Sequence, residues 1–266
     1  MNQHPYWHKQ TADRPLFPDI EWSKPEQQSK RGRLGIIGGN MVGFSSVAES
    51  YNSALKTGVG KVRVLLPNVL KKAIPITMTE VIFSPTNPSG SLSRKSITEM
   101  KAMGDWATGI LLIGDAGRNS ETAILYEDFI REYSGLLTIT RDAIDLLKNS
   151  SAQLVERPNT LLVASFAQLQ KLFQTVYYPK VITFSMQIIN LVEALHKFTT
   201  SYPINIAVLH KDTFLVASNG EVTSTPFNEP IQIWRGETAT KASVYWLWSP
   251  IKILESVTAS ISKNIN

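Results

Sequence analysis

The sequence predicts an α/β fold with a mostly parallel central sheet, and two observations lead to this prediction. Apolar segments of strand length alternate along the chain with stretches of helical periodicity. The strand segments are nearly continuous apolar runs, which is the pattern of strands that are buried on both faces between layers of helices. We therefore expect a three-layer α/β/α arrangement.

The order of the expected elements begins with a strand, a glycine turn and a helix. Leu34–Gly39 is a buried apolar strand that enters the turn, and Ser45–Lys56 has helical character. Further strands are expected at Lys61–Pro67, Glu80–Ser84, Thr108–Ile113, Leu136–Thr140, Thr160–Ala164 and Ile204–His210. Further helices are expected at Ser120–Tyr133, Ser185–Phe198, after Gly236 and over Pro250–Ser262. Two late strands around Asn219-Gly220 form an antiparallel hairpin, because these residues accept the positive φ of a tight turn.

The domain organisation follows from composition. The chain has 266 residues, of which 43% are hydrophobic and 18% are charged, as in ordinary globular proteins. Residues 1–32 are rich in proline and aromatic residues, so we expect an extended arm that is anchored by side chains such as Trp7 and Trp22. Residues 33–266 contain no repeat and no low-complexity linker, which predicts a single α/β domain.

Several classes of protein and site are disfavoured. The chain has no cysteine, which excludes disulfides, thiolate metal sites and a cysteine nucleophile, and favours a reducing, cytoplasmic location. No apolar run approaches the roughly 18 residues of a membrane span, and the start of the chain lacks the pattern of a signal peptide. The histidines His4, His8, His196 and His210 do not have metal-ligand spacing, so no metal ligands are predicted.

The net charge of +5 suits an anionic partner. The basic residues are scattered and are accompanied by 22 carboxylates, which favours a polyphosphate ligand over a nucleic acid. The densest basic cluster, residues 30–33, stands just before the first strand, and we interpret it as a solvated linker. The sequence predicts neither a nucleic-acid nor a membrane partner and leaves homo-oligomerisation open.

Candidate ligand contacts lie where strands end. Gly38 and Gly39 form either a turn that admits a ligand or a tight strand-to-helix connection. Asp115 and Asn119 follow the carboxyl end of a strand, which is the edge where open α/β sheets bind ligands. Asp142 precedes an apolar helical segment, so it either binds magnesium or caps a helix, and capping is the more frequent use.

A second glycine turn precedes a later helix. Gly236 and Thr238 open this helix, and its first backbone N–H groups are expected to bind phosphate. Glu237 is a candidate catalytic carboxylate, although the helix dipole alone favours an acid there. Arg235 is placed to neutralise a phosphoryl group in transfer.

Four segments in this order resemble the ADP- or ATP-dependent NAD(P)H-hydrate dehydratase family. Lys30–Asn40 is similar to the family's opening Lys-Gly pair, strand and Gly-Gly-Ser, and Ala54–Val64 to its helix that ends in Arg-x-Gly-Ala-Gly. Gly109–Gly117 matches the place of its Gly-Pro-Gly-Leu-Gly, and Thr140–Ile144 that of its Asp-Ala-Asp-Ala-Leu. The resemblance runs from Lys30 to about Ser243 and rests on the order and spacing of these motifs.

Downstream motifs depart from the family pattern. Leu162–Gln168 stands where the family has Leu-Thr-Pro-His-Pro-Gly-Glu and lacks both the histidine and the carboxylate. Leu209–Asp212, with Lys211, replaces Leu-Lys-Gly. The family's Gly-x-Gly-Asp turn corresponds to Gly236–Ala239, so Ala239 stands where the family has its aspartate base.

The resemblance implies a ribokinase-like fold, ATP or ADP with Mg²⁺ as cofactors, and hydrated NADH or NADPH as substrate. The reaction removes the hydroxyl of the hydrated nicotinamide after its phosphorylation. A positioned general base contributes about 10²- to 10⁴-fold in rate, so its replacement by alanine leaves three functions open: a divergent dehydratase, a catalytically reduced nucleotide-binding protein, and a small-molecule kinase of the same superfamily. The residues that the resemblance and the strand ends together place at the nucleotide or substrate are Gly38, Gly39, Asn40, Asp115, Asn119, Lys211, Arg235, Gly236 and Thr238, with Glu237 as the candidate catalytic group.

Overall fold

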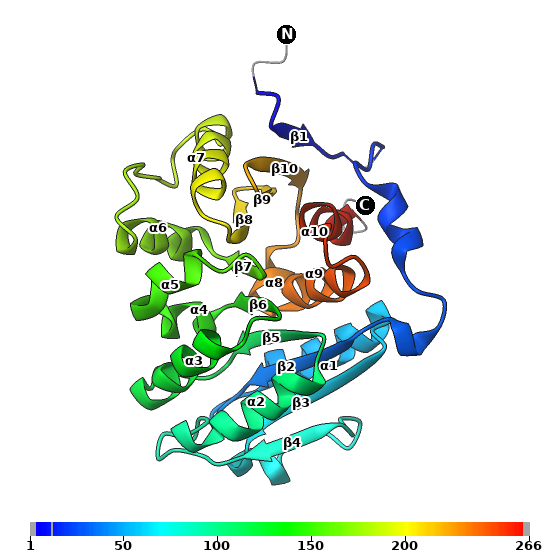
Figure 1. Cartoon of the computed structure of the whole chain (residues 1–266), viewed down its shortest axis with the longest axis vertical. Coiled ribbons are helices and arrows are strands. Elements are labelled where there is room, and N and C mark those ends of the chain that lie inside the picture. The colour runs from blue at the N-terminus through cyan, green and yellow to red at the C-terminus, as the bar shows by residue number, and fades with distance from the viewer. Residues whose placement is uncertain (1–3, 12, 263–266) are drawn as a thin grey trace.

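The computed structural model of the chain describes residues 4–11 and 13–262 and contains a ten-stranded sheet (Figure 1). The strands are β1 (Trp7–Lys9), β2 (Arg33–Gly38), β3 (Lys61–Pro67), β4 (Val81–Ser84), β5 (Gly109–Gly114), β6 (Leu136–Thr140), β7 (Thr160–Ala164), β8 (Asn205–His210), β9 (Thr213–Ser218) and β10 (Glu221–Pro226). The α-helices are α1 (Ser45–Thr57), α2 (Ile97–Trp106), α3 (Ser120–Glu132), α4 (Asp142–Leu146), α5 (Ser151–Val155), α6 (Phe166–Thr175), α7 (Ile188–Ser201), α8 (Pro230–Trp234), α9 (Glu237–Trp248) and α10 (Ile253–Ser262). The 3-10 helices are η1 (Pro18–Ser23), η2 (Gln28–Lys30), η3 (Asn68–Lys72), η4 (Arg94–Ser96) and η5 (Lys148–Ser150).

The sheet is parallel over most of its width and reverses direction at one end. Its order is β1-β10-β9-β8-β7-β6-β5-β2-β3-β4, with β4 through β8 parallel and with β9 antiparallel to both of its neighbours. Asn219 and Gly220, at the turn between β9 and β10, have φ values of 49° and 81°. The predicted mostly parallel sheet with a late antiparallel hairpin is therefore confirmed.

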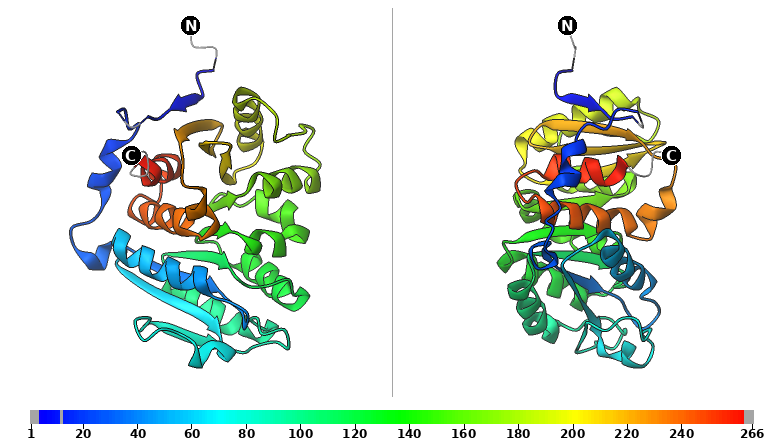
Figure 2. Two further views of the ribbon diagram at one scale, coloured as in Figure 1. Left: turned by 180° about the vertical axis from the view of Figure 1, so that it is seen from behind. Right: turned by 90° about the vertical axis from the view of Figure 1, so that its right-hand side faces the viewer.

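Two layers of helices cover the two faces of the sheet (Figures 1 and 2). Helices α2 to α7 pack on one face over side chains such as Phe129 and Phe198, both of which are buried. Helices α1, α9 and α10 pack on the other face over side chains such as Ile36 and Trp246. Strands with apolar residues on both faces require two such layers, which explains the nearly continuous apolar runs in the sequence.

The amino-terminal arm contains secondary structure of its own. Strand β1 pairs in parallel with β10 and so covers an edge of the sheet, while the indole N–H of Trp7 donates to Ser224 Oγ over 2.9 Å. The segment then passes across α10 as η1 (Figure 2). The prediction that Trp22 anchors the arm is wrong, because 87% of its surface is exposed. Phe17, five residues earlier in the chain, packs against the core instead. Residues 1–3 and 12 of the predicted arm, and 263–266 of the predicted domain, lie outside the described residues.

The strands that follow β2 in the chain and those that follow β5 are added on opposite sides of this pair in the sheet. After β2 the chain builds β3 and β4 on one side, and from β5 it builds β6, β7 and β8 on the other. The loops that follow β2 and β5 therefore diverge at the carboxyl edge of the sheet, which is where parallel α/β sheets bind ligands. Within the described residues, no helix is both long and apolar enough to cross a membrane.

Candidate functional site

The ends of β2 and β5 are packed backbone against backbone. The N–H of Gly39 donates to the carbonyl oxygen of Gly114 over 2.9 Å, and a Cβ at Gly38 would lie 2.2 Å from that oxygen. Gly39 has a φ of 82°. The backbone at Gly38 and Gly39 is therefore packed tightly against the end of β5, and whether the turn also contacts a ligand stays a prediction.

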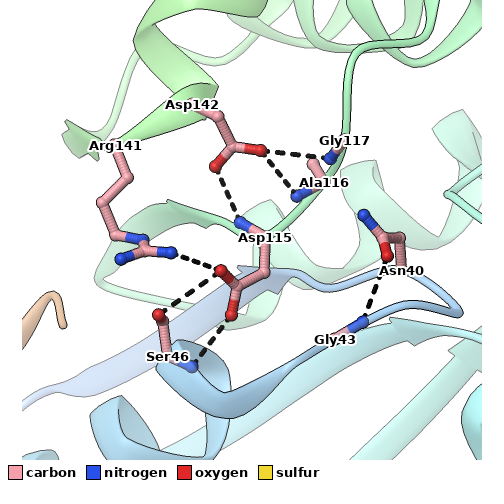
Figure 3. Close-up of polar contacts among 8 residues, drawn as sticks. All are labelled: Asn40, Gly43, Ser46, Asp115, Ala116, Gly117, Arg141 and Asp142. Atoms are coloured by element: carbon pink, nitrogen blue, oxygen red, sulfur yellow. Dashed lines mark hydrogen bonds and ion pairs between the residues drawn. The ribbon is translucent and has the colours of Figure 1, made fainter. Parts of the chain in front are cut away.

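Three consecutive backbone amides after β5 form an anion-binding nest. The N–H groups of Asp115, Ala116 and Gly117 point to one spot, where φ values of 90°, 53° and 72° at Gly114, Asp115 and Gly117 curve the backbone. All three donate to the carboxylate of Asp142, over 2.8 to 3.1 Å (Figure 3). This nest is thus filled by a carboxylate of the chain itself.

The start of α1 is filled in the same way. The carboxylate of Asp115 accepts the N–H of Ser46, in the first turn of α1, over 2.9 Å, and is also paired with the guanidinium of Arg141 (Figure 3). Asp115 thereby satisfies the positive end of the helix dipole. The structure places Asp115 at the carboxyl edge as predicted, with its carboxylate bound to α1 and Arg141.

The carboxyl group of Asp142 is largely buried and is surrounded by backbone N–H groups. Burial raises its pKa above the ordinary value, and the nearby charge of Asp115 acts in the same direction, while the backbone N–H groups and Arg141 act against it. Asp142 is the first residue of α4, but its oxygens bond to the loop after β5 and not to its own helix. Its main structural role is to tie β6 to β5.

The start of α9 differs from these two places. Its N-cap is Gly236, which has a φ of 84° and no side chain to accept from the first turn. Thr240 is the first residue whose N–H bonds within the helix, to Gly236 O over 3.0 Å. The amides of residues 237–239 precede it and have no acceptor within the helix. Among the described residues, no hydrogen bond from these three amides to an acceptor within α9 is present, and their binding of phosphate stays a prediction.

The two glycine turns meet at one point of the fold. A Cβ at Gly236 would lie 2.3 Å from Ile113 Cδ1, and a Cβ at Gly38 would lie 2.8 Å from Ile113 Cγ2. Ile113 directly precedes Gly114 in β5, so both turns pack on the same strand end. The hydroxyl of Thr238, which is 1% exposed, has no hydrogen-bond partner among the described residues.

The residues at and beside position 239 determine whether the turn carries a proton-transfer group. Ala239 is fully buried and offers no proton-transfer group. Glu237 forms an ion pair with Lys241 over 2.9 Å, one turn along the same helix. The candidate catalytic carboxylate is therefore already bound to a cation, and its role in catalysis stays a prediction.

The other predicted contact residues have identifiable structural roles. The Asn40 side chain accepts from Val42 N over 2.7 Å and shapes the turn after β2. Asn119 caps α3 by accepting from two amides of its first turn. Arg235 is 3.8 Å from Glu49 of α1, and Lys211 is exposed in the turn between β8 and β9, with a φ of 57°.

Two cavities lie at the carboxyl edge of the sheet. The larger, about 760 Å³, runs between α3 and α6 and includes Lys148 and Lys171. The smaller, about 250 Å³, lies at the ends of β6 and β7 and is lined by Arg141 and Trp234, two residues that no sequence motif indicated as ligand contacts. Asp142 and Gln168 belong to both cavities, which are therefore adjacent.

Within the described ranges, no group of three or more His, Asp or Glu side chains is arranged to hold a metal ion. Two candidate carboxylates are already paired with cations, Asp115 with Arg141 and Glu237 with Lys241. Mg²⁺ that enters with a nucleotide keeps several waters and is held mainly by phosphate oxygens, so it does not require a protein cage. The residues present fit a phosphate group better than a free metal ion.

Comparison with known proteins shows the fold of this chain but not its function. No protein-family model and no curated protein sequence matches the chain. Among solved structures, a ribokinase-like superfamily protein from Enterococcus faecalis V583 matches with a TM-score of 0.72 and 13% identity, over 97% of this chain and 86% of that one.

Two similar structures have a stated activity. The ADP/ATP-dependent NAD(P)H-hydrate dehydratase from Bacillus subtilis, co-crystallised with ATP/Mg²⁺, matches with a TM-score of 0.59 and 11% identity, over 92% of this chain and 85% of that one. The phosphomethylpyrimidine kinase from Clostridium difficile 630 matches with a TM-score of 0.56 and 11% identity, over 86% and 96%. Together with the strand order, these similarities show that the chain has the ribokinase-like fold.

Proposed function

We propose that this protein binds a nucleotide through its phosphates at the start of α9 and has reduced catalytic capacity. The observation that carries the proposal is the helix opening at Gly236, where the first amides of a twelve-residue helix have no acceptor within the helix and no capping side chain. Such amides, together with the helix dipole, favour phosphate.

Comparison of the three anion-binding places at this edge supports the assignment. The nest at residues 115–117 holds Asp142, and the start of α1 holds Asp115. A phosphate at either place has to displace a carboxylate that is already hydrogen-bonded. The start of α9 requires no such displacement, and the buried hydroxyl of Thr238 adds a donor without a partner among the described residues.

The side chains around α9 support the reduced catalytic capacity. Ala239 carries no base, and Glu237 is held by Lys241. Arg235 directly precedes Gly236, is 60% exposed and lies 3.8 Å from Glu49, so it is a solvent-facing cation that can approach a phosphate. Bound nucleotide would bring Mg²⁺, which supplies charge neutralisation of the phosphates, and residues 235–239 would hold the phosphate oxygens.

Thermal unfolding tests the proposed nucleotide binding. At a free ATP concentration of 100 times Kd, one site stabilises the fold by about 2.7 kcal/mol, which corresponds to a rise in Tm of roughly 5 to 10 °C for a chain of this length. ATP and ADP are expected to raise Tm, whereas adenosine, which lacks phosphates, is not. A Tm that does not change over a wide range of ATP and ADP concentrations would rule out the proposal.

A second candidate function is the repair of hydrated NADH or NADPH with ATP or ADP and Mg²⁺. It is favoured by Asp142, whose pKa is raised by burial and whose side chain lines both cavities at the carboxyl edge of the sheet, so that a proton-binding group borders them. The test follows the return of nicotinamide absorbance when hydrated NADPH is mixed with the protein and either nucleotide. A rate no faster than that in buffer excludes this activity.

Ala239→Asp tests whether the rest of such a site is intact. Restored turnover of at least about tenfold over wild type is expected if only the base is missing, because a positioned base contributes about 10² to 10⁴ in rate. Thr240→Asp, which places an equally buried carboxylate one position further along α9, is the matched control and is expected to give no turnover. If neither variant gains activity while both stay folded, the site lacks more than its base, and the dehydratase candidate is contradicted.

A further inference from the structure

The smaller cavity has the size of a single ring. It measures about 250 Å³ and lies at the carboxyl ends of β6 and β7, with Val163 and Ile233 among its apolar walls. Pockets for drug-sized ligands begin at about 300 Å³, so this cavity suits one ring with a small substituent. Trp234, at its rim, is 64% exposed. An exposed indole at the mouth of a cavity offers a flat surface on which a planar ring can stack.

Arg141 supplies most of the hydrogen-bonding capacity of this cavity. Its guanidinium carries five N–H donors, and one Nη is bound to Asp115, while the other end points away from that carboxylate (Figure 3). Its Nε is buried and has no acceptor among the described residues. A buried donor without an acceptor is unfavourable, so the fold leaves part of the hydrogen-bonding capacity of Arg141 unused.

Arg141 shares its carboxylate partner with another group of the protein. Asp115 also accepts from Ser46 at the start of α1, so its carboxylate is shared between a helix terminus and the guanidinium. Asp142, the other carboxylate on the cavity wall, is bound to three backbone N–H groups. The remaining acid nearby, Asp145, is bonded to Gln168 over 3.0 Å. Among the described residues the guanidinium of Arg141 bonds only to Asp115, so its other N–H groups are donors that can serve an acid group of a ligand.

The backbone of Arg141 is held in a rare conformation. Its φ of 57° and ψ of −143° lie in a region that residues other than glycine seldom adopt. Such conformations persist where the surrounding structure fixes them, and they gather at ligand sites. The dehydratase motif that this segment resembles has alanine at this position. Arg141 is thus a feature of this chain and not of the motif.

We propose that this cavity binds a planar ring that carries an acid group, with the acid on Arg141 and the ring against Trp234. This inference deepens the proposed function and rests on it, because it names the second ligand beside the nucleotide phosphates. The proposed ligand also differs from the substrate of the dehydratase. The nicotinamide ring of NAD(P)H carries a neutral amide at the ring position where nicotinate carries its acid group. A fork of N–H donors matches a carboxylate or a phosphate group and discriminates against an amide.

The test compares two probes of the same shape by titration calorimetry, in the absence of nucleotide. Nicotinate carries a carboxylate and nicotinamide a neutral amide, and wild type is expected to bind nicotinate at least about tenfold more tightly, because hydrogen bonds to charged groups have about twice the strength of neutral ones. Phenyl phosphate, in a third titration, shows whether a carboxylate or a phosphate is preferred. Arg141→Gln is expected to remove the preference for the acid, and Arg141→Lys to retain part of it.

One further variant measures the contribution of the ring contact to binding, and another serves as a control for the loss of an arginine. Trp234→Leu is expected to weaken nicotinate and nicotinamide by the same factor, about two- to tenfold, because it removes the stacking surface and leaves the cation. Arg131→Gln, which removes an exposed arginine on α3, is the matched control and is expected to bind both probes as wild type does. Thermal unfolding of each variant confirms that it is folded.

The outcomes of these titrations decide between the two proposals. Equal affinity for nicotinate and nicotinamide in wild type, no binding of either up to about 10 mM, or an unchanged preference in Arg141→Gln would overturn the acid-ring proposal. A protein that binds ATP but not nicotinate contradicts this inference alone. A protein that binds nicotinate but not ATP contradicts the proposed nucleotide binding and leaves Arg141 as the anion ligand.

Discussion

Gly38→Ala is expected to lower the free energy of unfolding by about 3 kcal/mol or more, the largest effect of any substitution considered for stability. The added Cβ would lie 2.2 Å from the carbonyl oxygen of Gly114, which is backbone and is held by the hydrogen bond from Gly39. Relief requires β2 and β5 to move apart at the edge where the site lies. Urea denaturation at constant pH measures the change.

Gly43→Ala is the matched control, because a Cβ at Gly43 has no atom within 4 Å among its described neighbours. It lies in the same loop, five residues further along, and is expected to change stability by less than about 0.5 kcal/mol. If Gly38→Ala were as stable as Gly43→Ala, the close packing of the two strand ends would be contradicted.

Gly236→Ala is expected to weaken ATP binding at least about tenfold and to destabilise the fold by about 1 to 2 kcal/mol. A side chain disfavours the φ of 84°, and its Cβ would lie 2.3 Å from Ile113 Cδ1. The side chain of Ile113 can shift, so the protein is expected to fold. The shift moves the first turn of α9 and its N–H donors, and titration calorimetry with ATP measures the effect.

Gly236→Asn separates the two causes, because asparagine tolerates left-handed φ but adds the same Cβ. It is expected to be more stable than the alanine variant and to bind ATP about as weakly. An alanine variant that binds ATP as wild type does would show that phosphate is not held at the start of α9.

The fold was predictable because its strands carry a strong local signal. Runs such as those of β5 and β7 are apolar throughout, which indicates burial on both faces, and Asn219-Gly220 indicates a hairpin. Strand β1 is only three residues long and forms by pairing with β10, a partner that is distant in the sequence, so no local pattern predicts it. Helix α6 was missed although Ser165 and Gln168 form a capping box, a signal that is readable in the sequence.

The site was predictable only in part. A glycine before a helix indicates first-turn amides without an acceptor in the helix, and the end of a strand indicates the place of Asp115. The pairing of Asp142 with residues 115–117 joins segments more than twenty residues apart, so the sequence offered only magnesium or a helix cap for it. Arg141 was missed for the same reason, because its backbone conformation and its cavity depend on the tertiary fold.

The most direct test of the account is a crystal structure of the protein with ATP and Mg²⁺. We expect phosphate oxygens within hydrogen-bonding distance of the backbone N–H groups of residues 237–239, with Asp142 still bound in the nest at residues 115–117. Phosphates bound in that nest with Asp142 displaced, or at a place remote from Gly236, would contradict this expectation.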